Sequence, residues 1–306
     1  MLGSGCASWY AVSKHRIAKT SAKCGASMIG TLFAGYKIVE KLGGRSNGVV
    51  FKAWNPRTSE FVAIKILFRD LFINDEKTAR FLREAQTAVI LDHPNIASLY
   101  ELGDQRGTQY IVMEYIEGKT FSKILENQPN GVSLKAFCGM IPPVVEALAY
   151  AHSQGVIHRD LKPDNLILNQ LGAPVIVDFG LSKTFSEEET NGFVTSQGMV
   201  LGSPGYMSPE QVQAMSHDHR TDIFSLGVIM YELLNGSNPF LDDSPIKAMQ
   251  KIINEDPMTL ELIRPDLPNE LINLISKCLE KELDNRYAHT HDLLVDLNEA
   301  LAPFIS

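Results

Sequence analysis

The densest group of reactive side chains in this 306-residue sequence lies at 158–165, which reads HRDLKPDN. Asp160 is followed by Lys162 two residues later and by Asn165 five residues later, between apolar flanks. A carboxylate can orient or deprotonate a hydroxyl group, a lysine can neutralise a phosphate, and an amide oxygen can bind a hard cation. A polar loop after a helix would explain the polarity of this stretch but not the choice of these residues.

Three other motifs could take part in phosphate chemistry, although each has an ordinary structural explanation when it is taken alone. The glycine-rich stretch 42–50, LGGRSNGVV, would let backbone N–H groups approach a triphosphate, and a hairpin turn explains it equally well. Lys65 ends the string VAIK and could pair with a phosphate or be a surface cation. Asp178 stands at the end of a strand predicted over 175–177, and a plain Asp-X-Gly turn also explains it.

The elements that must position these motifs fall into two regions of different secondary structure. Alternating and β-rich runs predict strands over 36–42, 49–54 and 61–67 and a hairpin of 99–102 with 109–115, and helical spacing predicts a helix over 77–91. Helices are expected later in the chain over 133–153, 222–234, 245–254, 269–281 and 290–301. Pro142 and Pro143 should bend or interrupt the first of these. The pattern predicts the α+β class, with a small β-rich region before a larger, mainly helical one.

The composition excludes several classes of protein. With 44% hydrophobic and 21% charged residues, the chain is neither disordered nor a disulfide-stapled miniprotein nor a collagen-like fibre. The four cysteines form no CxxC pair, which favours isolated reduced thiols. No uninterrupted run of 18 apolar residues occurs, so we expect no transmembrane segment. The net charge of −8 offers no electrostatic footprint for nucleic acid.

Residues 1–35 differ from the rest of the chain. They contain four cations, Lys14, Arg16, Lys19 and Lys23, and no acidic residue. Such a basic extension is either a disordered tail or a targeting segment, and its serines, threonines and cations resemble an organellar transit peptide. We therefore expect a cytoplasmic protein, with an organellar location as the alternative if 1–30 is a transit peptide.

Taken together, the motifs resemble those of eukaryotic-type (Hanks-type) serine/threonine protein kinases, in the same order and at similar spacing. The strings HPNI, GSPGYMSPEQ and DHRTDIFSLGVIMYELLNG are most similar to the bacterial branch of that family. The resemblance covers residues 36–302 and implies a two-lobed protein-kinase fold, with an N-lobe of 36–115, a C-lobe of 116–302 and the adenine of ATP between them. It also implies transfer of the γ-phosphate of Mg-ATP, with Mn²⁺ as an alternative metal, to serine or threonine hydroxyls of protein substrates, this chain itself among the candidates.

The resemblance also assigns roles to individual residues. Asp160 would orient the acceptor hydroxyl, Lys162 would neutralise the γ-phosphate, and Lys65, held by Glu84, would reach the α- and β-phosphates. Asn165 and Asp178 would bind the metal ion. The residues expected to contact ATP, besides Lys65, are Leu42, Gly43, Gly44, Gly48, Val50, Ala63, Met113, Glu114, Ile116 and Ile167.

Three further matches are structural, and two are regulatory. Glu210 and Arg286 resemble the family's buried ion pair, and Asp222 resembles the residue that anchors the backbone of 158–160. Thr195, with Ser196 as a second candidate, falls where bacterial relatives carry a phosphothreonine, so we expect autophosphorylation there. A flexible, hydroxyl-rich loop is the alternative explanation of that segment.

The glycine motif departs from the family's pattern, because Arg45 stands at its middle glycine. A side chain there could hold the backbone away from the β- and γ-phosphates, or could contact phosphate itself. This departure keeps a pseudokinase scaffold, which binds nucleotide or a partner without phosphoryl transfer, as an alternative. A small-molecule phosphotransferase of similar fold is a second alternative. The sequence does not indicate an oligomeric state.

Overall fold

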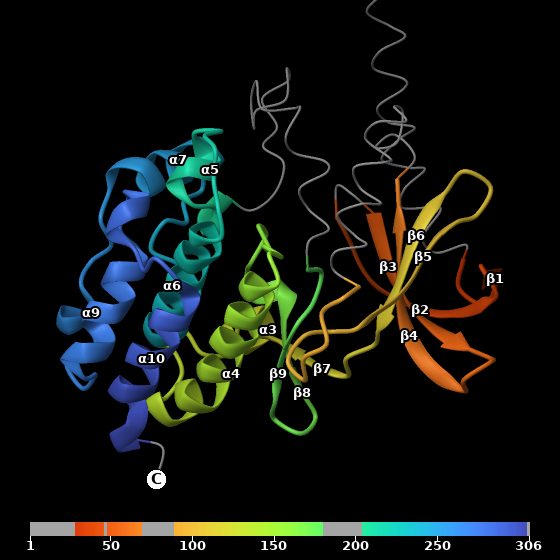
Figure 1. The fold of residues 1–306 in the computed structure, drawn as a ribbon, viewed down its shortest axis with the longest axis horizontal. Helices are drawn as coiled ribbons and strands as arrows, with labels where there is room; N and C mark the ends of the chain where they lie inside the picture. The colour runs from red at the N-terminus through yellow and green to blue at the C-terminus, as the bar shows by residue number, and fades with distance from the viewer. Residues whose placement is uncertain (1–27, 46–47, 69–88, 180–203, 305–306) are drawn as a thin grey trace, which may run out of the picture. The chain divides into compact units, whose positions relative to one another are not determined.

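The computed structural model describes residues 28–45, 48–68, 89–179 and 204–304. The chain divides into two compact units (Figure 1). Unit 1 comprises Met1–Ile73 and Leu99–Tyr115, and unit 2 comprises Asn74–Ser98 and Ile116–Ser306. The described part of unit 1 is a β-sheet and that of unit 2 is mainly helical, so the predicted α+β class is confirmed.

Unit 1 contains a single antiparallel sheet with the strand order β1-β2-β3-β4-β6-β5. Its strands are β1 (Leu32–Phe33), β2 (Tyr36–Arg45), β3 (Gly48–Asn55), β4 (Glu60–Leu67), β5 (Leu99–Asp104) and β6 (Gln109–Glu114). The three strands and the hairpin expected from sequence are all present. β2 extends three residues beyond the expected end at 42, because Gly43, Gly44 and Arg45 pair with the start of β3.

The two faces of this sheet have different compositions, as the period of two along a strand requires. On β4, Val62 and Ile64 point into the hydrophobic core, whereas Ala63 and Lys65 point to the opposite face. The core residues share this alternation on the neighbouring strands. They are Ile38, Val49, Phe51, Ala53, Val62, Ile64, Tyr110 and Val112.

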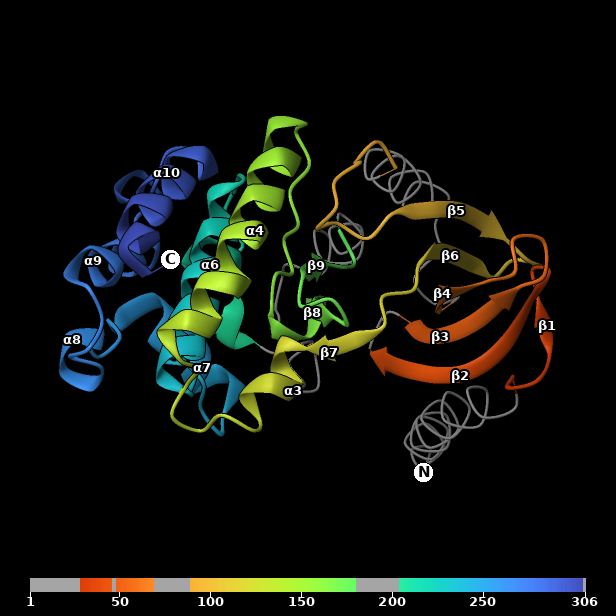
Figure 2. The same ribbon diagram turned by 90° about the horizontal axis from the view of Figure 1, so that it is seen from below.

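The sheet begins earlier than the sequence indicated, within the segment that we assigned to the basic extension. Leu32 and Phe33 pair with Lys37 and Tyr36 of β2. Figure 2 shows the sheet curling so that β1 comes close to the β5–β6 hairpin. There the ring of Phe33 meets that of Tyr110 edge to face at 5.4 Å.

A shared carboxylate ties β2 to this hairpin. The hydroxyl groups of Tyr36 and Tyr110 donate to the two oxygens of Glu101, at 2.8 and 2.6 Å. Burial and the hydrogen bond to Glu101 raise the pKa of Tyr36 to about 12, so both phenols remain donors at neutral pH. The bonds join strands near the two edges of the curled sheet.

Unit 2 is built around two long helices, α4 (Leu134–Ser153) and α6 (Arg220–Asn235). A small antiparallel sheet, β7-β8-β9, joins Gly118–Thr120, Leu166–Asn169 and Pro174–Ile176. The remaining helices are α3 (Phe121–Leu125), α5 (Pro209–Val212), α7 (Pro245–Asn254), α8 (Leu260–Ile263), α9 (Asn269–Cys278) and α10 (Thr290–Leu301). Short 3₁₀ helices lie at Pro163–Asn165, Pro204–Tyr206, Leu283–Asn285 and Ala302–Phe304.

Helix α4 continues through Pro142 and Pro143, so the interruption allowed for in the sequence analysis does not occur. The prolines remove two backbone donors, but buried residues on both sides of them hold the helix in the core. Among the described helices, α4 alone is long and apolar enough to cross a bilayer, a test that the core helix of a globular protein also passes. Residues 77–88 of the helix expected over 77–91 lie outside the described residues, and 89–91 are not helical, so the expected end at 91 is wrong.

Candidate active site

The loop between α4 and β8 places three of the predicted catalytic and metal-binding residues together. The Lys162 ammonium forms an ion pair with the carboxylate of Asp160. The side-chain amide of Asn165 donates from Nδ2 to the backbone oxygen of Asp160 at 2.8 Å. Lys162 and Asn165 are buried, at 5% and 6% exposure, whereas the Asp160 side chain is 47% exposed and open to a reactant.

His158 joins this loop to the segment that carries Asp178. Its Nε2–H donates to the backbone oxygen of Val177 at 3.0 Å, and its Nδ1 accepts from the backbone N–H of Asp160 at 3.2 Å. Together the two bonds fix the tautomer of the imidazole. The backbone N–H of Val177 donates to the carbonyl of Asn165 at 2.9 Å. The residue before Asp178 is therefore tied to both His158 and Asn165.

A buried carboxylate from α6 anchors the start of the loop. Asp222 is fully buried and accepts the backbone N–H groups of His158 and Arg159, each at 2.7 Å. His152 of α4 donates to the same carboxylate at 2.9 Å and contacts Thr290 at 2.7 Å. Burial alone would raise the pKa of Asp222, but the hydrogen bonds from His152 and from the backbone N–H of His158 hold it below its usual range.

Two residues of the loop region have a left-handed backbone conformation. Arg159 and Asp178 both have a φ of 64°. Such a conformation costs roughly 1 kcal/mol or more for a residue other than glycine, so it persists only where the surroundings determine it. The hydrogen bonds of Asp222 and His158 provide such constraints next to both residues.

In unit 1, the register of the sheet places the predicted ATP contacts in one row. Gly43 of β2 pairs with Val50 of β3, and Val50 pairs with Lys65 of β4. Ala63 lies two residues before Lys65 on the same face and pairs with Met113 of β6. This face is the one opposite the hydrophobic core of unit 1. Lys65 is 5% exposed.

The three glycines of the glycine-rich stretch differ in what they require. A Cβ atom added at Gly48 would lie 2.4 Å from the carbonyl oxygen of Ile66, so the pairing of β3 with β4 requires glycine there. A Cβ atom at Gly43 would meet nothing within 4 Å, and one at Gly44 would make only ordinary contacts. Gly48 is therefore required by the pairing of β3 with β4. At Gly43 and Gly44 the absence of a side chain leaves the backbone N–H groups accessible to a ligand such as a phosphate.

The other predicted ATP contacts are divided between the units. Leu42 lies on β2 with 43% exposure, and Glu114 ends β6. Ile116 belongs to unit 2, as does Ile167, which lies on β8 opposite Thr120 and Val175.

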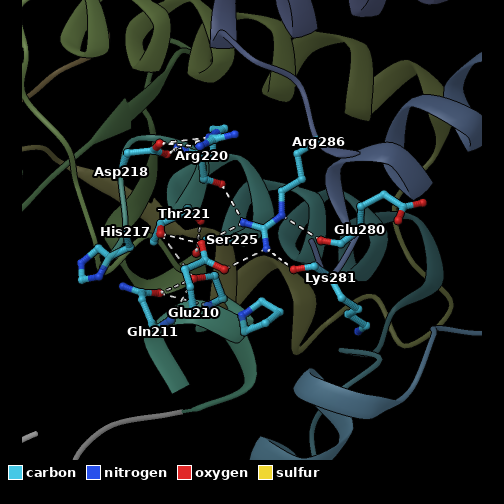
Figure 3. A network of polar contacts seen from close by, with 12 residues as sticks. Glu210, Gln211, His217, Asp218, Arg220, Thr221, Ser225, Glu280, Lys281 and Arg286 are labelled. Carbon is cyan, nitrogen blue, oxygen red and sulfur yellow. Dashed lines mark hydrogen bonds and ion pairs between the residues drawn. The ribbon is translucent and has the colours of Figure 1, made fainter. Parts of the chain in front are cut away.

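Glu210 and Arg286 form a bidentate ion pair in unit 2 (Figure 3). The two guanidinium nitrogens Nη1 and Nη2 each donate to one oxygen of Glu210 at 2.8 Å. The remaining donors of Arg286 reach the backbone oxygens of Glu280, Lys281 and Arg220 at 2.8, 3.0 and 3.2 Å. Burial alone would raise the pKa of Glu210, but Arg286 holds it below its usual value.

A profile of the family described as "Protein kinase domain" matches residues 36–296 of the chain. The chain belongs to the protein kinase family. The serine/threonine-protein kinase PrkC of Bacillus subtilis (strain 168) is 35% identical to it over 275 residues, which cover 89% of this chain and 42% of PrkC. The serine/threonine-protein kinase PknB of Mycobacterium tuberculosis is 34% identical over 266 residues, covering 86% of this chain and 42% of PknB.

Solved structures agree with this assignment. The crystal structure of the M. tuberculosis PknI kinase domain matches with a TM-score of 0.71 and 26% identity, covering 89% of this chain and 98% of that domain. The chain spans less than half the length of the related kinases PrkC and PknB. The resemblance to bacterial Hanks-type kinases and the predicted kinase fold are confirmed.

Several residues predicted for kinase function lie outside the described residues. They are Glu84, Thr195 and Ser196, and their assignments stay predictions. The resemblance also makes Arg159, which precedes Asp160, the candidate partner of a phosphate at Thr195 or Ser196. Arg159 is described, and its Nε is buried without a hydrogen-bond partner among the described residues.

The structure adds positioning residues to which the sequence analysis gave no role. His152 contacts Asp222, Thr221 donates to Glu210 at 2.7 Å, and Gln211 donates to the backbone oxygen of Arg159 at 2.9 Å. Gln211 stands directly after the Ser-Pro-Glu motif, which is the one sequence signal that marked its neighbourhood.

Proposed function

We propose that this chain is an ATP-dependent protein kinase that transfers the γ-phosphate of ATP to serine or threonine hydroxyls of protein substrates. The observation that carries this proposal is the loop of Asp160, Lys162 and Asn165, built as one hydrogen-bonded unit on the anchor Asp222. Membership of the kinase family and the serine/threonine kinases among its relatives support it.

The residues of unit 2 have distinct roles in this reaction. The exposed carboxylate of Asp160 accepts a hydrogen bond from the acceptor hydroxyl and orients it for attack. Lys162, already paired with Asp160, is the cation next to the transferring phosphoryl group and offsets its charge. In unit 1, Lys65 binds phosphate oxygens, while Val50 and Ala63 lie on the same face of the sheet and provide the apolar surface for the base.

We propose Mg²⁺ as the metal, with Asn165 and Asp178 as its protein ligands. Protein kinases as a family use ATP and a divalent cation, which would offset the negative charge of the phosphates. The chemistry of these side chains fits, because Nδ2 of Asn165 bonds the backbone oxygen of Asp160, and Oδ1, a hard oxygen, would be the atom that binds the ion. In the described part of the chain no group of three or more His, Cys, Asp or Glu side chains is placed to hold a metal ion.

Incubation of the purified chain with Mg-ATP labelled at the γ-phosphate and a generic protein substrate tests the proposal. Asp160→Asn, which keeps the size of the side chain but removes the carboxylate, is the control. Label on the substrate or on the chain itself, lost in Asp160→Asn, is the expected result. Nucleotide binding without transfer would instead identify a pseudokinase scaffold, and phosphorylation of small molecules alone would identify the other alternative.

The regulatory and targeting predictions concern residues outside the described ranges. We propose Thr195 as the autophosphorylation site, and mass spectrometry of active protein that finds Thr195 unmodified would refute this. We propose a cytoplasmic location, with residues 36–302 as the kinase domain after a basic extension. A native N-terminus near residue 30, found by protein sequencing, would favour an organellar transit peptide instead.

A further inference from the structure

We propose that Gln211 is a positioning residue, whose side-chain amide holds the carbonyl group of Arg159 and thereby fixes the orientation of Asp160. This inference rests on the proposed kinase function. Gln211 lies in α5, 52 residues after Arg159 in the chain, and its Nε2 donates to the Arg159 oxygen at 2.9 Å. Asp160 is the next residue after that carbonyl.

The peptide groups on both sides of Arg159 are held from two directions. Asp222 of α6 accepts its N–H at 2.7 Å, and Gln211 donates to its carbonyl oxygen at 2.9 Å. Arg159 has the left-handed φ of 64°, which an arginine adopts only where neighbouring groups impose it. Asp222 alone fixes the N–H end of this residue. The next peptide group, which leads to Asp160, is held at its N–H by His158 Nδ1 at 3.2 Å and at its carbonyl oxygen by Gln211.

Only an amide side chain satisfies both neighbours of Gln211. Its Oε1 accepts from the backbone N–H of Ser208 at 3.0 Å, while its Nε2 donates to Arg159. Ser208 in turn caps α5 by accepting from the backbone N–H of Gln211, which completes a capping box. A glutamate at this position would preserve the cap but would have no N–H for Arg159 when ionised.

The residues that support Gln211 are buried and connected by hydrogen bonds. Ser208 and Thr221 are both fully buried, and their hydroxyl groups lie 3.3 Å apart. Thr221 donates to Glu210, which is paired with Arg286. Figure 3 shows Gln211 next to Glu210 at the edge of this network. A chain of contacts therefore connects the buried ion pair, through Ser208 and Gln211, to the residue that precedes Asp160.

Gln211→Glu isolates the proposed bond, and Gln213→Glu is the matched control. Both variants add one negative charge at the end of α5, but Nε2 of Gln213 donates to the backbone oxygen of Pro209 at 3.2 Å and not to the loop. We expect Gln211→Glu to lower kcat about tenfold with the KM for ATP within about twofold, and Gln213→Glu to leave both close to wild type. The melting temperature of Gln213→Glu should stay near that of the wild type. That of Gln211→Glu should be lower at neutral pH and approach the wild type as the pH falls, because its raised pKa makes the ionised form unfavourable in the folded protein.

The pH profile distinguishes positioning from a general loss of structure. A carboxylate that faces the carbonyl oxygen of Arg159 at this partly buried position is disfavoured, so its pKa is raised, and its protonated form carries an O–H donor. The kcat of Gln211→Glu, divided by that of the wild type, should therefore rise as the pH falls. Gln211→Met, which removes the donor without adding charge, should lower kcat at every pH and show no such recovery.

Hydrogen exchange of the full-length chain provides a readout that does not need activity. The peptide covering 156–162 should exchange faster in Gln211→Glu than in the wild type and in Gln213→Glu. If the wild type is active and Gln211→Glu matches it in kcat, the inference is overturned. If the wild type is as inactive as Asp160→Asn, the proposed function fails. In that case the exchange rate of peptide 156–162 still tests Gln211, and an unchanged rate in Gln211→Glu would overturn its role.

Discussion

The buried ion pair of Glu210 and Arg286 should be a principal determinant of the stability of unit 2. All five N–H groups of the Arg286 guanidinium are used, two by Glu210 and three by backbone oxygens. The exposed fractions of the two side chains are 4% for Glu210 and 0% for Arg286. Glu210→Gln keeps the shape of the side chain but leaves the buried guanidinium without a counter-charge.

An uncompensated buried charge costs about 3–5 kcal/mol. For a domain of this size each kcal/mol lowers the melting temperature by about 2–4 °C, so we expect Glu210→Gln to melt roughly 6–20 °C below the wild type. Asp218→Asn is the control, because Asp218 also bonds an arginine at 2.8 Å but is 42% exposed. Its loss should lower the free energy of unfolding by less than about 1 kcal/mol.

Urea denaturation at pH 7 and thermal melting measure these differences, and a double-mutant cycle separates the pair from its surroundings. Glu210→Met combined with Arg286→Met should cost less than the sum of the two single changes, since no charge is then left buried. The pKa of Glu210 is depressed in the folded protein, so its contribution is complete above the unfolded value of about 4.3 and is lost as the pH falls below it. A loss below about 1 kcal/mol in Glu210→Gln, or strictly additive single changes, would refute this reasoning.

The remaining predictions concern the partly buried side chain of Lys281 and the glycine-rich stretch. Burial lowers the pKa of Lys281 to about 8. Lys281→Met should therefore raise the free energy of unfolding by about 1 kcal/mol at pH 7. Urea denaturation should show this gain in stability disappearing as the pH rises from about 8 to 10.5. Gly48→Ala should melt several degrees below Gly43→Ala, because only a Cβ atom at position 48 clashes with the carbonyl oxygen of Ile66 on β4. Equal melting temperatures of the two variants would contradict the register in which β3 pairs with β4. Arg45→Gly should lower the KM for ATP in steady-state kinetics, because it restores the middle glycine, and equal values in the two proteins would show that position 45 does not limit nucleotide binding.

Much of the local structure was predictable because its signals are local. The bounds expected for the helices at 245–254 and 290–301 are those of α7 and α10. Pro245 lies in the first turn of α7, where backbone N–H groups make no hydrogen bond within the helix, so the N–H that proline lacks is not needed there. On β4, the alternation of Val62 and Ile64 with Ala63 and Lys65 already separated the core face from the face of the ATP candidates.

Elements with weak local signals were missed. β1 has two residues, one of them Leu32 at 72% exposure, so no alternation could reveal it. The three-residue strand β7 is held by pairing with β8 and not by a pattern of its own, whereas the strand expected over 175–177 is present as β9. Pro142 and Pro143 predicted a bend or an interruption, and the helix is not interrupted because buried residues on both sides hold it in the core.

The sequence by itself determined which residues are able to do chemistry, because Asp160, Lys162 and Asn165 stand within six positions and share one loop. Only the tertiary structure decided how that loop is held. Asp222 reaches His158 across 64 residues, and Gln211 reaches Arg159 across 52. The hydrophobic periodicity of the sequence predicts which face of a single helix or strand is buried. It does not predict which donor and acceptor from distant elements form a hydrogen bond, because they come together only in the folded chain.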